Sequence, residues 1–172
     1  MKFLVEKKNE DRHFHLIYEE EGCSFNIEPF PKNIGFTSIL IDFLQLEIDC
    51  ENRVVYAWGY EPLMKYEETN NFPKFYEHKD IIAIFDQMPT PGVSIRLLKN
   101  SEWPDKSEWP TYINKKMGWV CIGDPTIQDK RLIEFAPDCV AALDHENEMV
   151  AIWLHPRELP SRIYETSMNL PN

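Results

Sequence analysis

The sequence predicts a mainly β protein, either all-β or α+β, with short strands arranged in one or more antiparallel sheets. Short alternating or continuous apolar segments recur along the chain, and turn-forming residues separate them. Helical segments do not alternate regularly with these strands, which argues against a parallel sheet. We expect about nine or ten short strands, built from hairpins, and one or two short helices. A length of 172 residues with 43% hydrophobic residues is expected to give a single domain over residues 1–172.

The first part of the chain is expected to form a β-meander. Apolar and β-branched residues gather in three short runs, and polar residues separate these runs, as is typical of hairpin connections. The runs are Lys2–Glu6, Arg12–Tyr18 and Cys23–Glu28. Two prolines and Gly35 then predict a bend before the next strand.

The segment Ile39–Pro62 is expected to form a hairpin with two β-rich arms. Apolar residues alternate with Gln45 and Glu47 in the first arm, which is the period of a half-buried strand. The second arm places four large side chains on one face: Val54, Tyr56, Trp58 and Tyr60. At the turn, Asp49 can accept backbone hydrogen bonds and Asn52 tolerates the left-handed conformation.

A shorter copy of this hairpin is expected over Val140–Pro156. Its Asp144, Glu146 and Asn147 repeat the D-x-E-N turn, and Trp153 follows Asn147 at the distance that separates Trp58 from Asn52. Two explanations are open. An internal duplication of residues 39–62 and 140–156 would place both hairpins at equivalent positions, whereas independent use of one favourable turn would make the tryptophans ordinary packing residues.

The remaining elements are short. A helix is expected from Ser107 to Met117, with Gly118 as its C-terminal stop, and one helical turn in the tail Pro156–Asn172. Lys65–Pro73 is polar and is expected to be a surface loop. The other predicted strands are Asp80–Asp86, Val93–Lys99, Trp119–Ile122 and Arg131–Phe135.

The chain is strongly acidic. Its net charge is −11, and residues 1–86 carry 17 acidic against 9 basic side chains. Such a field repels nucleic acid and anionic membranes, so neither is an expected partner, and it favours a basic protein. The alternative interpretation is that the charge serves solubility alone.

Cysteine usage and the N-terminus indicate the cytoplasm. The four cysteines are widely spaced without a C-x-x-C pair, so we expect free thiols and no zinc site. The first residues have no signal-peptide pattern, and no apolar run is long enough for a membrane span.

Few residues suggest catalysis or cofactor binding, and we expect no cofactor. His13 and His15 share one face of a predicted strand and could bind a metal if another strand supplied a third ligand. The opposing interpretation is a surface strand that happens to carry two histidines. Neighbouring carboxylates such as Glu67 and Glu68 lie in predicted loops or turns, where they are solvated. The chain also lacks nucleophile-elbow, phosphate-loop and dinucleotide-binding motifs.

The segment Ser101–Pro110 is the strongest candidate for partner binding. It repeats Ser-Glu-Trp-Pro, so that each tryptophan, Trp103 or Trp109, follows an acidic residue, Glu102 or Glu108. Tryptophan is frequent at interface hot spots, and proline lowers the entropy that a loop loses on binding. The opposing interpretation is that the two tryptophans fold back onto a sheet edge. Together with Glu67 and Glu68, these four residues form the predicted partner-binding set.

Three functions are compatible with this sequence. The first is a non-catalytic protein-binding module, in its sharpest form an acidic cytoplasmic immunity or inhibitor protein that masks a basic partner such as a toxin. The second is a small-molecule- or metal-binding β-barrel enzyme that uses His13 and His15. The third is a structural homodimer subunit. The absence of catalytic motifs favours the first.

Overall fold

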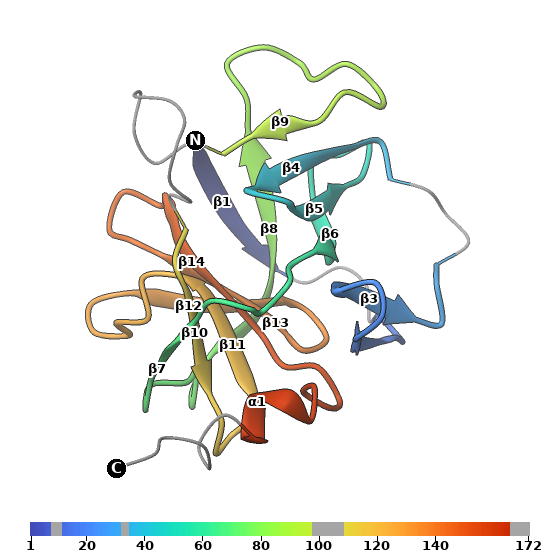
Figure 1. Ribbon diagram of the computed structural model, residues 1–172. Coiled ribbons are helices and arrows are strands. Elements are labelled where there is room, and N and C mark those ends of the chain that lie inside the picture. The colour runs from blue at the N-terminus through green and yellow to red at the C-terminus, as the bar shows by residue number, and fades with distance from the viewer. Residues whose placement is uncertain (8–11, 32–34, 98–108, 166–172) are drawn as a thin grey trace.

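The computed structural model describes residues 1–7, 12–31, 35–97 and 109–165, and these form fourteen strands in two sheets and one short helix (Figure 1). The predicted mainly β fold class is confirmed. The strand count is higher than expected, partly because the first arm of the Ile39–Pro62 hairpin is itself two strands. These join at the turn Asp42–Phe43, where Asp42 has a φ of 53°.

The larger sheet has eight strands in the order β1-β8-β12-β13-β14-β11-β10-β7. In that order they are β1 (Lys2–Lys7), β8 (Glu77–Ile84), β12 (Arg131–Ala136), β13 (Cys139–Leu143), β14 (Met149–Leu154), β11 (Trp119–Gly123), β10 (Thr111–Asn114) and β7 (Glu67–Glu68). In Figure 1, strands β10 to β14 occupy the lower part of the molecule, and β8 runs from this group toward the smaller sheet.

The smaller sheet has six strands in the order β2-β3-β6-β5-β4-β9. They are β2 (His15–Glu19), β3 (Ser24–Glu28), β6 (Val54–Tyr60), β5 (Leu44–Ile48), β4 (Thr37–Ile41) and β9 (Ile95–Arg96). The helix α1 (Arg162–Glu165) lies in the C-terminal segment, where one helical turn was expected. Within the described ranges, the chain offers no helix long and apolar enough to cross a membrane.

Three expectations need correction. The β-meander expected in the first part of the chain is wrong at its first strand, because β1 pairs with β8 in the larger sheet and not with β2. The sheets are mixed rather than purely antiparallel, because β7 with β10, β8 with β12, and β4 with β9 pair in parallel. The helix predicted over 107–117 is wrong for its described part, because β10 and a turn occupy those residues. The side chains of Thr111, Tyr112 and Ile113 favour a strand, and Ile113 is buried opposite Val120. Gly118, with a φ of 72°, closes a hairpin rather than a helix.

The two D-x-E-N turns have the same hydrogen bonds. Asp49 Oδ1 accepts from the amides of Glu51 and Arg53 at 2.9 Å, and Asp144 Oδ1 accepts from Glu146 and Glu148 at 2.9 Å. Asn52 and Asn147 are both left-handed, with φ of 62° and 61°. A register shift precedes each turn, between Glu47 and Ile48 in β5 and between Ala142 and Leu143 in β13.

This equivalence extends over five strands at a constant offset of 95 residues. The strands β2 to β6 pair in the order β2-β3-β6-β5-β4, and β10 to β14 pair in the order β10-β11-β14-β13-β12. The registers correspond across the two halves. Leu16↔Ile27 matches Thr111↔Ile122, Phe25↔Gly59 matches Val120↔Leu154, and Glu47↔Tyr56 matches Ala142↔Ala151. Of the two explanations left open by the sequence, duplication is the one that expects such equivalent positions.

The β1–β8 pair joins the two halves. Phe3 and Ala83 lie opposite each other in that pair. The amide of Ala83 donates to the carbonyl of Asn52, and the amide of Phe3 donates to the carbonyl of Asn147, both at 2.9 Å. Each D-x-E-N turn is therefore fixed to one strand of the same antiparallel pair.

The faces of the two sheets are covered differently. One large buried cluster contains residues of both sheets, such as Phe25 and Ile39 with Ile133 and Ile152. A second cluster lies on the other face of the eight-stranded sheet and includes Trp119, Val140 and Trp153. Phe72, Tyr76 and Ile127, from the connections before β8 and β12, pack against it. The central strands of the large sheet are therefore buried on both faces.

The left-handed asparagines provide a matched test of the two halves. Replacing either Asn52 or Asn147 with alanine should lower the free energy of unfolding by about 1 kcal/mol, because a Cβ-bearing residue other than Asn is disfavoured at positive φ. Glycine at the same positions should change it by less than about 0.5 kcal/mol. Urea denaturation of the four variants measures both effects. Equal losses for alanine and glycine would show that backbone conformation is not the cause.

Candidate functional site

One face of the six-stranded sheet carries a row of aromatic residues, of which Tyr56 belongs to the large buried cluster and Trp58 packs against it. Pairing across the strands places Gln45 beside Trp58, Glu47 beside Tyr56, and Ser24 beside Tyr60. Phe43, at the turn before β5, adds its ring at the end of this row. We call this surface the outer face and define it by Ser24, Asn26, Phe43, Gln45, Trp58 and Tyr60.

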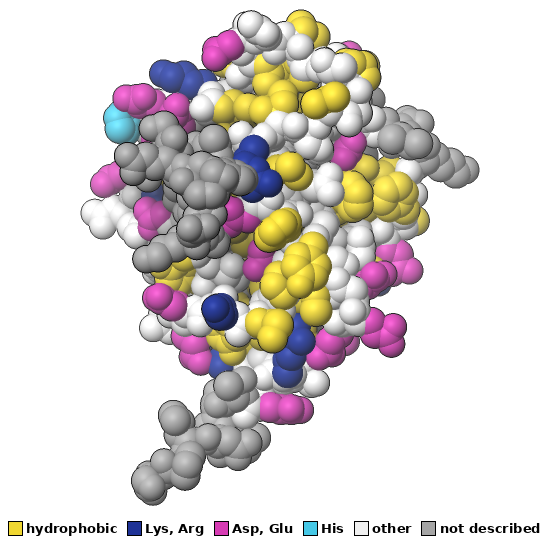
Figure 2. All heavy atoms as spheres, turned by 45° about the horizontal axis from the view of Figure 1, so that its top comes forward, with side chains coloured by type: hydrophobic (Ala, Val, Ile, Leu, Met, Phe, Trp, Pro, Cys, Tyr) yellow, Lys and Arg dark blue, Asp and Glu magenta, His cyan; other side chains and the backbone are white. Residues whose placement is uncertain are grey.

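Its aromatic side chains are accessible at one end. Phe43 is 65% exposed and Tyr60 49% exposed, and their rings meet edge to face with centroids 6.0 Å apart. At the other end, Phe14 and Phe30 contact Tyr56, which is only 4% exposed. Figure 2 shows hydrophobic side chains in a broken band over one side of the molecule, with acidic side chains at both flanks. Such accessible aromatics on a polar sheet face are typical of a protein-binding surface.

Hydrogen bonds hold the polar residues of this sheet face in place. The indole Nε1 of Trp58 donates to Glu47 Oε2 at 3.1 Å. Ser38 donates to Gln45 at 3.2 Å, and its hydroxyl lies 2.7 Å from that of Ser94. These contacts fix the orientation of Trp58 and Gln45 on the sheet.

Glu47 is covered by the backbone at Gly35. A Cβ at residue 35 would lie 1.9 Å from Glu47 Oε1, so only glycine fits there. Burial raises the pKa of Glu47, and the hydrogen bond from Trp58 opposes that rise. Since Glu47 is only 8% exposed, its role here is to position the tryptophan ring.

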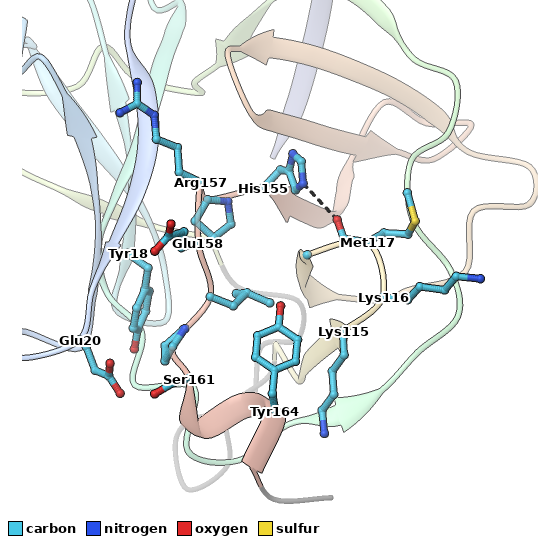
Figure 3. A pocket seen from close by; sticks show the side chains of 14 residues that line it. Tyr18, Glu20, Lys115, Lys116, Met117, His155, Arg157, Glu158, Ser161 and Tyr164 are labelled. Atoms are coloured by element: carbon cyan, nitrogen blue, oxygen red, sulfur yellow. Dashed lines mark hydrogen bonds between the residues drawn. The ribbon is translucent and has the colours of Figure 1, made fainter.

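A second candidate is an open cleft of about 710 Å³ beside β2. Figure 3 shows Tyr18 and Glu20 on one side and Lys115 and Lys116 on the other, with residues 155–161 running between them and α1 below. Lys115 is paired with Glu68 at 2.6 Å, which offsets its charge. The cleft therefore has mixed polarity and no strong excess of either charge.

The titratable groups of the cleft bond to the protein itself. His155 stacks on Trp119, with ring centroids 4.6 Å apart, and its Nε2 lies 3.0 Å from the carbonyl of Met117. Because a carbonyl can only accept, this nitrogen carries the proton. The Tyr18 hydroxyl donates to the Glu61 carbonyl, and burial raises its pKa. Neither residue is placed as a general base toward the cleft.

Next to the cleft, the carboxyl group of Glu61 has a raised pKa. Burial raises its pKa to about 7, the hydroxyl of Thr111 donates to its Oε1 at 3.2 Å and opposes the rise, and the charge of Asp42 adds to it. A carboxyl that titrates near neutral pH is a frequent feature of functional sites, but structural carboxyls also show it. Its hydrogen bond to β10 links the ends of the two halves.

The predicted partner-binding set is dispersed. Trp109 is only 2% exposed, and its indole donates to the carbonyl of Leu97 at 3.4 Å, so its expected role as an exposed contact is corrected. A tryptophan beside the buried sheet gains more from burial than from exposure. Trp103, Glu102 and Glu108 lie outside the described residues. Glu67 and Glu68 are exposed on β7, and Glu68 pairs with Lys115.

The two histidines lie on one face of their segment, as expected, but the described residues supply no third metal ligand beside them. His13 and His15 are exposed and alternate with the buried Phe14 and Leu16. Over the parts of the chain that the structure describes, no group of three or more His, Cys, Asp or Glu side chains is close enough to hold a metal ion. All four cysteines are free thiols.

The outer face was only partly visible in the sequence. The alternation of Tyr56, Trp58 and Tyr60 placed them on one face, as the structure shows. Val54, predicted on the same face, is instead fully buried opposite Ile48, because a register shift interrupts the alternation there. Phe43 was missed, because Asp42 and Phe43 fall within an apolar run that reads as one strand. The aspartate is the signal that could have revealed it, since Asp tolerates the left-handed conformation of a tight turn.

Comparison of the chain with models of known protein families and with curated proteins gives no match.

Glu61 makes stability pH-dependent in a definite direction. Its folded pKa lies above the ordinary value of 4.5, so its contribution to stability is complete below pH 4.5 and is lost as the pH rises through 7. Between pH 4.5 and 8, this titration should cost the wild-type protein about 1–3 kcal/mol of its free energy of unfolding, and Glu61→Gln should not show that loss. Urea denaturation of wild type and Glu61→Gln from pH 4.5 to 8 measures this. The exposed Glu6→Gln serves as a control, and parallel curves for wild type and Glu61→Gln would contradict the assignment.

Proposed function

We propose that the protein is a non-catalytic protein-binding module, in its sharpest form an acidic cytoplasmic immunity or inhibitor protein that masks a basic partner such as a toxin. The outer face is the observation that carries this proposal. Phe43 and Tyr60 offer accessible aromatic surface, and Trp58 is held in position by Glu47. Such anchors, surrounded by polar groups, are the usual composition of interface hot spots.

Charge around this face supports a basic partner. Glu19 and Glu28 are exposed on β2 and β3, and their side chains point to the same side as Ser24 and Asn26. Asp42 precedes Phe43. The whole chain carries a net charge of −11. Long-range attraction would accelerate the encounter with a basic protein, and burial of the aromatic rings would slow its release.

The enzyme and homodimer alternatives have weaker support. His13 and His15 lack a described third ligand, and His155 and Tyr18 are bonded to protein groups. In a symmetric dimer through the outer face, the carboxylates of one copy would oppose those of the other. The charge of this face therefore favours a partner of opposite sign.

The experiment is affinity capture with variants matched in residue type. Phe43→Ser with Tyr60→Ser removes two accessible rings from the outer face. Phe75→Ser with Tyr164→Ser removes the same two ring types elsewhere, from positions 80% and 47% exposed. Wild type and the second variant should retain a basic protein from the source cells, whereas the first should lose at least about tenfold in affinity, as loss of a hot spot predicts.

Mass spectrometry identifies the retained protein, and circular dichroism checks that each variant folds. The proposal would be contradicted if the Phe43/Tyr60 variant still retained the partner and the Phe75/Tyr164 variant did not. That result would point to the cleft, which Tyr164 lines. Retention by both variants would also contradict it.

Electrostatic steering is testable with the same partner. Glu19→Lys with Glu28→Lys should reduce the association rate constant several-fold at low salt and leave dissociation nearly unchanged, because these side chains are solvent-exposed at the rim. The control is Glu6→Lys on β1. Surface plasmon resonance measures both rates between 50 and 500 mM salt. The electrostatic screening length changes about threefold over that range. If the rim and control substitutions reduced the association rate constant equally for each unit of charge changed, the outer face would have no special role.

A further inference from the structure

We infer that the partner places an extended segment, aromatic and basic in composition, against Trp58 of the outer face, in the way that residues 69–76 cover Trp153 in the other half of the molecule. The inference rests on the proposed function and specifies what the outer face recognises. It follows from the equivalence of the two halves at an offset of 95 residues, which pairs Trp58 with Trp153.

In the second half, the equivalent face is covered by the chain itself. Phe72 and Tyr76 pack against the cluster that contains Trp119 and Trp153. They belong to the connection between β7 and β8, which has no helix. Thr69 donates its amide to the carbonyl of Ile113, and Asn71 bonds to the carbonyl of Pro125 at 3.0 Å. The fold therefore already contains one example of a non-helical, aromatic segment seated on this type of face.

In the first half, the described residues give a similar cover at one end. Phe30 and Gly35, in the connection from β3 to β4, lie over Tyr56 and Glu47. The corresponding connection in the second half supplies Ile127. Trp58 itself packs against the large buried cluster. Trp58 is half-buried, whereas Trp153 is fully buried.

The residues of the two faces also differ: the covered face has mostly apolar residues where the outer face has polar ones. Where the covered face has Trp119, Cys121 and Val140, the outer face has Ser24, Asn26 and Gln45. Where the covered face has Ala142, the outer face has Glu47, which accepts the indole proton of Trp58. The Nε1 of Trp153 is buried with no partner in the described part of the chain. The outer face is thus suited to contact with water when free and with a polar, aromatic segment when bound.

The edge of the six-stranded sheet limits how that segment binds. In the second half, β7 adds to the edge strand β10 in parallel. In the first half, the equivalent edge strand β2 is already bonded at Leu16, whose amide donates to Asp138 and whose carbonyl accepts from Arg157. The partner segment therefore contacts the face through side chains rather than by adding a strand to β2.

The charge of the rim selects the composition of the segment. Glu19 lies opposite Ser24, the neighbour of Tyr60, and Asp42 precedes Phe43, whereas Glu28, farther along the same face, lies 4.0 Å from Arg157. Lysine or arginine beside the aromatic residues would therefore be favoured and acidic residues disfavoured. A second copy of this chain would bring the same carboxylates together.

The probe is a synthetic peptide, KNNFPKFYK, which keeps residues 70–76 and adds a lysine at each end. The control peptide replaces its three aromatic residues with serine. Backbone amide chemical-shift changes, measured by NMR on the full chain, should map to residues 24–26, 43–45 and 58–60 with the probe and should be absent with the control. Trp58→Ala and the milder Tyr60→Ser should each weaken probe binding at least about fivefold. Phe75→Ser should leave it unchanged.

The absence of any shift with the probe would overturn the inference, and so would shifts confined to the cleft residues 115–118 and 155–161. Shifts at equal concentrations of the probe and the serine control would overturn it too, because charge alone would then explain binding. Concentration-dependent dimerisation of the free protein that the probe does not reverse would assign the face to a second copy instead. If partner capture depends on Phe43 and Tyr60 while no peptide binds, the inference fails and the proposed function stands.

Discussion

The fold depends on two backbone hydrogen bonds that fix two equivalent turns to one pair of strands. The carbonyls of Asn52 and Asn147 accept from Ala83 and Phe3, which face each other in the β1–β8 pair. Each carbonyl is oriented by a left-handed asparagine and by an aspartate that binds two backbone amides. Two five-strand units are thereby held together around one shared core.

The two equivalent five-strand units are covered differently. In the second copy, Phe72, Tyr76 and Ile127 cover the sheet face, and small or apolar residues such as Ala142 and Val140 fill the space beneath them. In the first copy, Glu47 and Gln45 take these places, and two aromatic rings remain accessible. Burial of apolar area stabilises the covered unit, whereas the other unit keeps two aromatic rings accessible to solvent.

Sequence reasoning identified both D-x-E-N turns and the shared face of Tyr56, Trp58 and Tyr60, because these depend on local hydrogen bonds and on the alternation of a strand. It assigned too few strands and a helix over residues 107–117. A turn as short as Asp42–Phe43 is hidden in an apolar run, and Ile113 becomes a strand residue through its pairing with Val120. It also placed Trp109 at an interface, although packing against the sheet buries it.

The sequence by itself determined the mainly β class, the chemistry of the two turns and the acidic character of the chain. These are properties of residue type and short-range spacing. The tertiary structure decided which of the two equivalent tryptophans is covered. Trp58 and Trp153 follow equivalent turns, but Phe72 and Tyr76 pack against the cluster that contains Trp153. The turn sequences do not show which tryptophan is covered, because the cover comes from a segment distant in the chain.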